Sequence, residues 1–451
     1  MRNAIDIDRL ERAGGGLAVV GLATGAIAGF GASLAGGVVA APFSAVDATL
    51  LAAIFTAAYI AIAERDDLFR PLLPAALAAI AIAGPAAWLA AERASLGAGA
   101  APFPTVFWAA LGGPLVFVIL TSLAKAALQA PNGARYSAFF VHATAAPVVL
   151  GLVAAFAAIA ALFLASIGAL GAPAAAGVDL TRISAPAVAY PAIGGALGLL
   201  YGVIRGQWAF LGALRFAILW ACRAFAPIAA LLAVAFAIAV GLGAVAPPAP
   251  GATLAAAIGC AVVFNGVYQN GLGTRGALAR IAADVLALAG LAFAVLAATG
   301  FWAVIAASGA GPAQIVGFAL AAVASLHFAF YAFALLTELR PRANEWAPAI
   351  RPANVAMAAV WAATLTALAT PAANLWALSA DSHARALADA RTTPDDIDFD
   401  RLSASFGRYG ERVAARHAPT PNPLTSTPHP AAVNGPSVND LPLVAPTDPE
   451  D

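Results

Sequence analysis

The chain has 451 residues, of which 62% are hydrophobic and 10% are charged, and its formal net charge at pH 7 is zero. An average soluble domain is about 45–50% apolar and about 25% charged, so this composition excludes a soluble globule of this size. Only two cysteines occur, which excludes a disulfide scaffold, and 23 basic against 23 acidic residues do not make a basic nucleic-acid-binding protein. The class that remains is a polytopic membrane protein.

Eleven apolar runs are long enough to cross a bilayer. A helix needs about 20 mainly apolar residues to span roughly 30 Å of hydrocarbon, and irregular backbone cannot face lipid. The runs are residues 16–40, 44–63, 71–90, 105–125, 139–168, 187–204, 224–246, 252–270, 283–307, 312–337 and 353–377. The predicted fold class is therefore all-α: a polytopic transmembrane helix bundle of about 11 spans with a short, partly helical C-terminal tail. Counts of ten and twelve stay open.

Basic residues in the predicted loops indicate an orientation, because Lys and Arg favour the cytoplasmic side of short loops. Of the 17 basic residues before residue 379, 15 lie at the N-terminus or on every second loop after it. The pattern predicts a multi-pass membrane protein with a cytoplasmic N-terminus, and in the bacterial plasma (inner) membrane, where we expect it, a periplasmic C-terminal tail. A re-entrant run at 353–377 would instead place the tail inside.

The neutral total charge divides unevenly along the chain. Eleven acidic and six basic residues follow residue 378, so the tail is acidic and the membrane part is mildly basic. We expect a transmembrane helical domain at 1–378 and a short polar helical unit at 379–417, with helices at 381–391 and 400–416. Nine prolines among residues 418–451 predict a disordered end.

The first candidate binding cluster ends the eighth predicted span. Asn265, Tyr268 and Gln269 are spaced three and four apart, so on a helix they share one face and could bind a polar ligand or headgroup. The alternative, which the sequence favours, is hydrogen bonding between helices next to a helix end.

The second candidate cluster lies in the tenth predicted span. His327, Tyr331 and Glu338 fall on one helical face, and His327 is the deepest titratable group of the chain. It could serve as a proton acceptor or polar anchor. The favoured alternative is a hydrogen-bonded packing residue, with Glu338 paired to Arg342 at the membrane surface.

The segment 205–223 mixes arginines with large aromatic residues and predicts an interfacial amphipathic helix that anchors the chain on anionic lipid. The five histidines are scattered, and neither HxxxH nor CxxC occurs. Nucleophile motifs are also missing. The sequence therefore predicts no metal, no cofactor and no catalytic residues.

A tail motif begins after the last span. It comprises Asp398, Phe399, Asp400, Leu402, Gly407, Arg408, Tyr409 and Gly410. Together with the many-span layout, this pattern resembles the C-terminal signature of a bacterial membrane family catalogued as domain of unknown function 4153. The resemblance implies a multi-pass protein and supplies no mechanism.

Three functional hypotheses follow. The favoured one is a permease, or a component of a transporter, for a small or lipid-linked substrate, since few residues lie outside the membrane. The second is a membrane-embedded transferase acting on a lipid carrier, with the acidic run 395–400 binding a divalent cation. The third is a non-catalytic scaffold or signalling partner whose tail binds another protein. The expected partners are thus the bilayer, the unknown ligand and a protein at the tail, and not nucleic acid.

Overall fold

A computed structural model describes residues 22–23, 45–63, 69–129, 135–169, 186–246, 248–269, 276–337 and 346–417. Within these ranges the chain is helical and has no strand. Apart from residues 22–23, the predicted first span at 16–40 lies outside the described residues, and so does the proline-rich segment 418–451.

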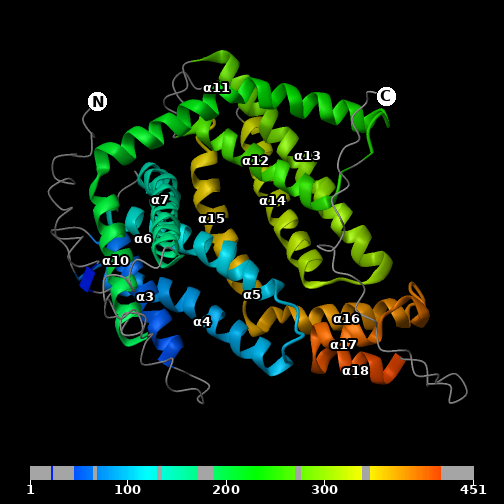
Figure 1. The fold of residues 1–451 in the computed structure, drawn as a ribbon. Helices are drawn as coiled ribbons and strands as arrows, with labels where there is room; N and C mark the ends of the chain where they lie inside the picture. The colour runs from blue at the N-terminus through cyan, green and yellow to red at the C-terminus, as the bar shows by residue number, and fades with distance from the viewer. Residues whose placement is uncertain are drawn as a thin grey trace, which may run out of the picture.

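Each of the ten other predicted runs contains a helix (Figure 1). The membrane-part elements are α3 (Ala45–Ile62), α4 (Leu72–Leu96), α5 (Phe103–Phe107), the π-helix η1 (Trp108–Gly112), α6 (Gly113–Gln129), α7 (Arg135–Ala169), α10 (Pro186–Gly206), α11 (Trp208–Gly241), α12 (Pro250–Tyr268), α13 (Ala277–Ser308), α14 (Pro312–Thr337) and α15 (Ile350–Leu368). The C-terminal elements are η2 (Pro371–Ala373), α16 (Leu375–Ala388), η3 (Pro394–Asp396), α17 (Phe399–Phe406) and α18 (Arg408–His417).

Seven helical segments of the described chain are long and apolar enough to cross a membrane. They are Leu72–Leu96, Phe103–Gln129, Tyr136–Phe156, Ala209–Val240, Pro250–Tyr268, Ala277–Ser308 and Pro312–Thr337. An eighth candidate combines α15 with α16, but these two helices bend by 75° at the break between them. The apolar helices make the chain a multi-pass membrane protein, and the expected count of about 11 spans is not confirmed within the described ranges.

The predicted interfacial helix at 205–223 is not a separate element. Residues Trp208–Gly241 form one continuous helix, α11, which joins most of that segment to the predicted span 224–246. Its 34 residues extend about 50 Å at a rise of about 1.5 Å per residue, which exceeds the hydrocarbon thickness. Large apolar side chains are exposed along it, from Phe210 to Ile238. The arginines interrupt the apolar run without interrupting the backbone hydrogen bonds, so the helix continues through them.

Arg205 has a structural role that differs from lipid anchoring. It is buried, and its guanidinium donates to the carbonyl oxygens of Ile60 and, over 2.9 Å, of Ala63. These carbonyls end α3, where a cation is favoured by the helix dipole and by the unsatisfied backbone acceptors. Arg205 therefore joins the end of α10 to the end of α3.

Two glycines let helices approach closely in the bundle. A Cβ atom added at Gly266 in α12 would lie 2.5 Å from the Cβ of Cys222 in α11. At Gly290 in α13 it would lie 2.3 Å from the ring of Phe328 in α14. Small residues allow this packing where lipid-facing helices gain little from hydrophobic burial.

The C-terminal helices pack together at one end of the bundle (Figure 1). Trp376 in α16 donates its indole N–H to the carbonyl oxygen of Ala101 over 3.1 Å, and the backbone N–H of Ala101 donates to Ser405 in α17 over 2.9 Å. The N–H of Ala310 donates to the Ser382 hydroxyl over 2.9 Å. The C-terminal unit therefore contacts both the α4–α5 loop and the α13–α14 loop, at the same end of the bundle.

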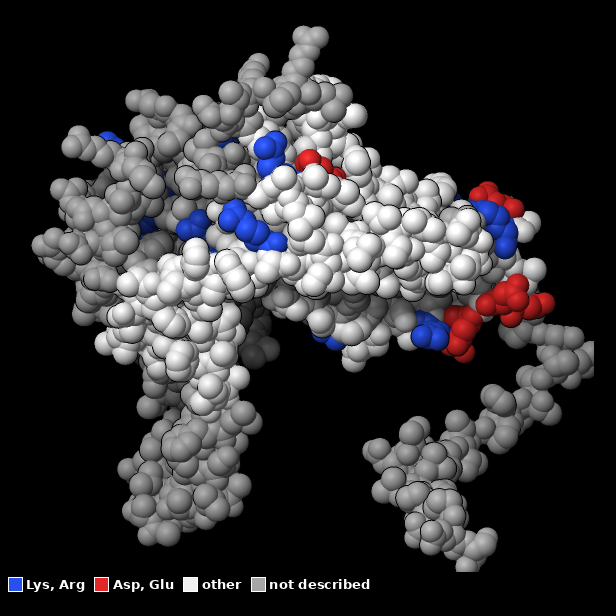
Figure 2. Space-filling model, turned by 90° about the horizontal axis from the view of Figure 1, so that it is seen from above, with Lys and Arg blue, Asp and Glu red and all other residues white. Residues whose placement is uncertain are grey.

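The surface in Figure 2 has a broad uncharged area, with charged side chains gathered toward its two sides. Many large apolar residues are exposed on the long helices, for example Leu231 at 70% and Phe333 at 65%. Contiguous exposed apolar surface of this extent marks contact with membrane rather than water.

Candidate binding site

Asn354, near the start of α15, is the centre of a hydrogen-bonded network inside the bundle. Its Oδ1 accepts from the Tyr331 hydroxyl and from His327 Nε2, the latter over 3.2 Å. Its Nδ2 donates to the Tyr136 hydroxyl and to Asn265 Oδ1, each over 2.9 Å. The side chain is buried. The network therefore joins four helices, α7, α12, α14 and α15, through one amide.

The contacts of His327 assign its protonation. Trp361 Nε1 lies 3.2 Å from His327 Nδ1, and an indole nitrogen can only donate. Nδ1 is therefore an acceptor, and Nε2 carries the hydrogen that is donated to Asn354. His327 is a neutral histidine with both ring nitrogens hydrogen-bonded inside the protein. This geometry favours a positioning and packing role over that of a free proton acceptor.

The structure brings together Asn265, Tyr331 and His327, which the sequence placed in two separate clusters. Asn265 Nδ2 donates to the Tyr331 hydroxyl over 2.8 Å, so α12 and α14 are connected directly. Phe264 stacks on Tyr331 with 4.5 Å between the ring centroids. Glu338 lies outside the described residues.

The side chains of two other predicted residues bond to backbone carbonyl oxygens, although the Tyr268 ring also packs against the Tyr136 ring at 6.3 Å between centroids. The Tyr268 side chain is buried, and its hydroxyl donates to the carbonyl oxygen of Ala347 over 2.8 Å. Gln269 follows the end of α12 with φ at 52°, and its Nε2 reaches back to the carbonyl oxygen of Gly266. Gln269 does not share the expected helical face with Asn265 and Tyr268, because α12 ends at Tyr268.

Sequence reasoning did not single out Asn354, Tyr136 or Trp361, although they complete the network. Asn354 stands inside a predicted span, and an amide in hydrocarbon needs hydrogen-bonding partners. That signal could have marked it as a partner for the other polar residues in the spans.

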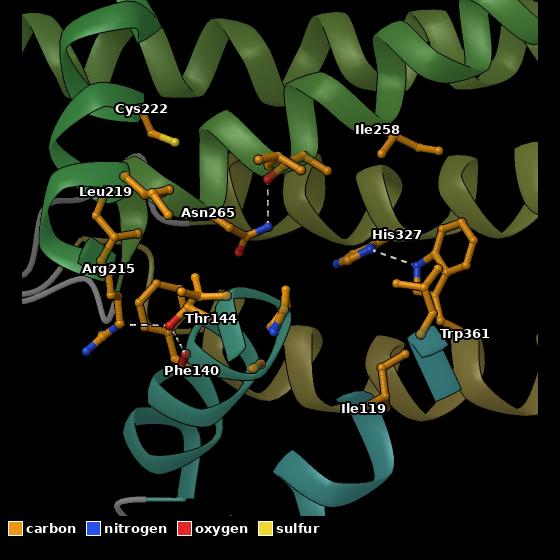
Figure 3. A pocket seen from close by; sticks show the side chains of 18 of the residues that line it. Ile119, Phe140, Thr144, Arg215, Leu219, Cys222, Ile258, Asn265, His327 and Trp361 are labelled. Atoms are coloured by element: carbon orange, nitrogen blue, oxygen red, sulfur yellow. Dashed lines mark hydrogen bonds between the residues drawn. The ribbon is translucent and has the colours of Figure 1, made fainter. Parts of the chain in front are cut away.

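A cavity of about 560 Å³ reaches this network (Figure 3). It lies between α6, α7, α11, α12, α14 and α15, and most of its wall is apolar. The polar groups in the wall are Thr144, Arg215, Cys222, Asn265, His327 and Trp361. A concave apolar site of roughly 300–1,000 Å³ with a few placed polar groups is typical for small ligands.

Arg215 in α11 is the charged group of this cavity wall. Its Nε donates to the Thr144 hydroxyl over 2.8 Å, and that hydroxyl donates to the carbonyl oxygen of Phe140 over 2.7 Å. The guanidinium carbon lies 5.5 Å from the centroid of the Phe140 ring. These contacts fix the orientation of the guanidinium. Arg215 lies on the opposite side of Figure 3 from His327 and Trp361.

Two further cavities in the described part of the chain have different walls. One also holds about 560 Å³ and lies next to Trp108 and Phe117. The other holds about 440 Å³ and lies next to Phe236 and Phe293. Neither wall contains Lys, Arg, His, Asp or Glu. Volume alone does not distinguish the cavities, but their polar groups do.

The tail motif has a clear structural role. Arg408 donates to the Glu92 carboxylate over 2.8 Å, and the Tyr409 hydroxyl donates to the same carboxylate over 2.8 Å. Asn374 Nδ2 donates to the Tyr409 hydroxyl over 3.0 Å. The hydrogen bond to Tyr409 and the nearby Glu92 charge raise the pKa of Arg408. These contacts attach the C-terminal unit to the end of α4.

Gly407 divides the expected second tail helix, 400–416, into α17 and α18. Its φ is 52°, and an added Cβ would lie 2.7 Å from the carbonyl oxygen of Leu96. Only glycine adopts this backbone conformation without strain at such a close contact. The break lets α18 turn back and places Arg408 next to Glu92.

The acidic residues of the tail act mainly as helix caps. Asp398 accepts from the backbone N–H of Arg401 over 2.8 Å at the start of α17. Thr393 donates its hydroxyl and backbone N–H to Asp396, which holds the pKa of that carboxyl below its usual value. Asp400 is exposed in the first turn of α17, a position that the helix dipole favours for an acid. Among the described residues, no group of three or more His, Cys, Asp or Glu side chains could hold a metal ion.

Comparison of the chain with protein-family models, with curated proteins and with solved structures found no match.

Proposed function

We propose that this protein binds a small or lipid-linked substrate within the membrane, as a permease or as a component of a transporter. The observation that carries the proposal is the cavity of about 560 Å³ that extends between six helices to Asn265 and His327. A bundle packed without a cavity would have no place for a substrate. The largely apolar wall suits a substrate with a substantial apolar part.

We also propose eleven spans in the bacterial inner membrane, with a cytoplasmic N-terminus and a periplasmic C-terminal unit. The contacts of that unit support this orientation. It binds the α4–α5 and α13–α14 connections, both of which the distribution of basic residues assigns to the outer side. A C-terminal alkaline phosphatase fusion should therefore be active. An active cytoplasmic reporter at the same position would contradict the orientation.

Membership of the family catalogued as domain of unknown function 4153 is likewise our proposal. It is supported by the coordinated roles of the tail motif, in which Gly407 permits the turn and Arg408 and Tyr409 reach Glu92. The transferase and scaffold hypotheses gain no comparable support. The acidic run that a transferase would use caps helices, and the tail motif that a scaffold would offer is engaged within the chain.

The cavity can be tested with a photoactivatable probe. The purified protein would be labelled with a diazirine-bearing tetradecanol, and the labelled peptides identified by mass spectrometry. Ala261→Phe fills the cavity wall from α12, whereas Ala255→Phe changes an exposed residue of the same helix that does not line the cavity. We expect labelling near His327 to fall several-fold in the first variant only. Labelling that Ala261→Phe leaves unchanged would overturn the proposal.

A further inference from the structure

We propose that the cavity beside Arg215 binds an anionic amphiphile, whose head group pairs with that guanidinium and whose apolar chain extends toward His327 and Trp361. The inference rests on the proposed function and specifies its substrate class. It distinguishes a lipid-like substrate with a carboxylate or phosphate head from an uncharged apolar molecule.

The orientation of Arg215 leaves part of its guanidinium available to an anion. The Thr144 hydroxyl donates to the carbonyl oxygen of Phe140 and therefore presents a lone pair to Arg215 Nε. The Phe140 ring packs against the guanidinium at 5.5 Å. Since Nε is occupied, the two terminal amino groups are the donors left for an anion. Their planar arrangement matches two oxygens of a carboxylate or phosphate.

The charge of Arg215 also favours an anionic ligand. Arg215 is partly buried and lies on α11, in which Arg223 is the one other charged residue. No carboxylate among the described residues forms an ion pair with it, since the ion pairs found there involve Arg391 and Arg408. A cation at the edge of a low-dielectric region is costly unless an anion accompanies it. A bound anionic head group would supply that charge.

The rest of the cavity is largely apolar. Beyond Arg215 the wall is formed by apolar side chains such as Ile119, Ile258 and Phe328. At the far end, both ring nitrogens of His327 are already hydrogen-bonded, to Trp361 and Asn354. His327 therefore has no vacant hydrogen-bond donor for a second charged group of a ligand. One charged head and one apolar chain therefore fit the cavity better than a polar solute.

The chain supplies a matched control for the charge. Arg280 in α13 also packs its guanidinium on an aromatic ring, at 5.6 Å from the centroid of Trp346, but it does not line the cavity. Arg215→Gln and Arg280→Gln thus each remove one positive charge beside an aromatic ring, although Arg280 is exposed and lies near the Asp284 carboxylate. Arg215→Lys retains the charge and loses the planar pair of donors.

The experiment measures the affinity of two diazirine probes of equal chain length, tetradecyl phosphate and tetradecanol, for the detergent-purified full chain. For tetradecyl phosphate we expect Arg215→Gln to weaken binding at least about ten-fold and Arg215→Lys to weaken it less, while Arg280→Gln leaves it unchanged. Tetradecanol binding should fall much less than tetradecyl phosphate binding in the two Arg215 variants, and should stay unchanged in Arg280→Gln. A matching series with tetradecanoic acid distinguishes a phosphate from a carboxylate head group.

The outcomes separate this inference from the proposed function. If both probes label the cavity, and Ala261→Phe blocks them but Arg215→Gln does not, the anionic head group is wrong and the substrate cavity stands. If Ala261→Phe affects neither probe, the substrate cavity itself is wrong. Equal losses in Arg215→Gln and Arg280→Gln would indicate a general effect of surface charge and would overturn the role of Arg215.

Discussion

Asn354 Nδ2 donates a hydrogen bond to Asn265 Oδ1 over 2.9 Å, and thereby connects the start of α15 to the end of α12. The same Asn354 amide accepts from Tyr331 and His327 and donates to Tyr136. A single side chain thus fixes the relative positions of four helices next to the cavity. When Asn354 is replaced, its four partners stay buried or partly buried without it. Replacing Asn354 is therefore more costly than removing one isolated hydrogen bond.

Replacing Asn354 with Leu should therefore destabilise the bundle. We expect the free energy of unfolding to fall by about 2 kcal/mol, because several polar groups lose their partner. The effect is no larger because each hydrogen bond in a membrane protein contributes little. Thermal unfolding of the detergent-purified protein measures the change. Ser325→Ala is the control, since that hydroxyl bonds only to the carbonyl oxygen of Ala321 in its own helix. Equal stability of the two variants would contradict the central role of Asn354.

The structure predicts different effects for His327 and Gln269. His327→Ala removes a cavity wall residue and its hydrogen bonds to Asn354 and Trp361. It should weaken binding of the tetradecanol probe about five- to ten-fold, which corresponds to roughly 1–1.4 kcal/mol. Gln269→Ala should leave binding unchanged, because that side chain turns back to Gly266 beyond the end of α12. The reverse order of effects would indicate that the ligand binds near the α12–α13 connection instead.

Close packing of α11 on α12 can be tested at Gly266. Gly266→Ala places a methyl group 2.5 Å from the Cβ of Cys222 and should cost about 1–3 kcal/mol through overpacking. Gly259→Ala in the same helix has no neighbour within 4 Å and should be neutral or slightly stabilising. The double variant with Cys222→Gly should recover part of the loss in the same thermal assay. No recovery would mean that the steric contact is not the cause.

Attachment of the C-terminal unit depends on the ion pair between Arg408 and Glu92. In a double-mutant cycle of Arg408→Ala and Glu92→Gln, we expect a coupling free energy of about 0.5–1 kcal/mol, the range for a partly exposed pair. Chymotrypsin should cleave the C-terminal unit faster in either single variant. Arg416→Ala provides a control, since that arginine is exposed in the last turn of α18. A coupling energy of zero would show that the other contacts alone hold the unit.

Local sequence features predicted much of this structure. The lengths of the apolar runs predicted a helix in every described run, and the tail helices expected at 381–391 and 400–416 overlap α16 and the pair α17 and α18. The break at Gly407 was missed, although a glycine within a short polar helix is a known weak point. The continuity of α11 does not follow from the sequence, because arginines beside aromatic residues are equally typical of a helix at a membrane surface.

The binding site could be predicted only in part. Asn265, His327 and Tyr331 were named as polar residues within apolar runs, which is a local property. Their meeting with Asn354 was not predicted, because it depends on how each helix is rotated and where helices distant in sequence pack.

The sequence by itself determined that this chain is a helical, multi-pass membrane protein, because the length and apolarity of a helix suffice to decide whether it can cross a bilayer. Only the tertiary structure decided which polar groups face each other. Asn354 binds Tyr136 across 218 positions of the chain, and Arg408 binds Glu92 across 316. The physical reason is that hydrogen bonds require alignment within about 3 Å, which packing of whole helices supplies and no local pattern encodes.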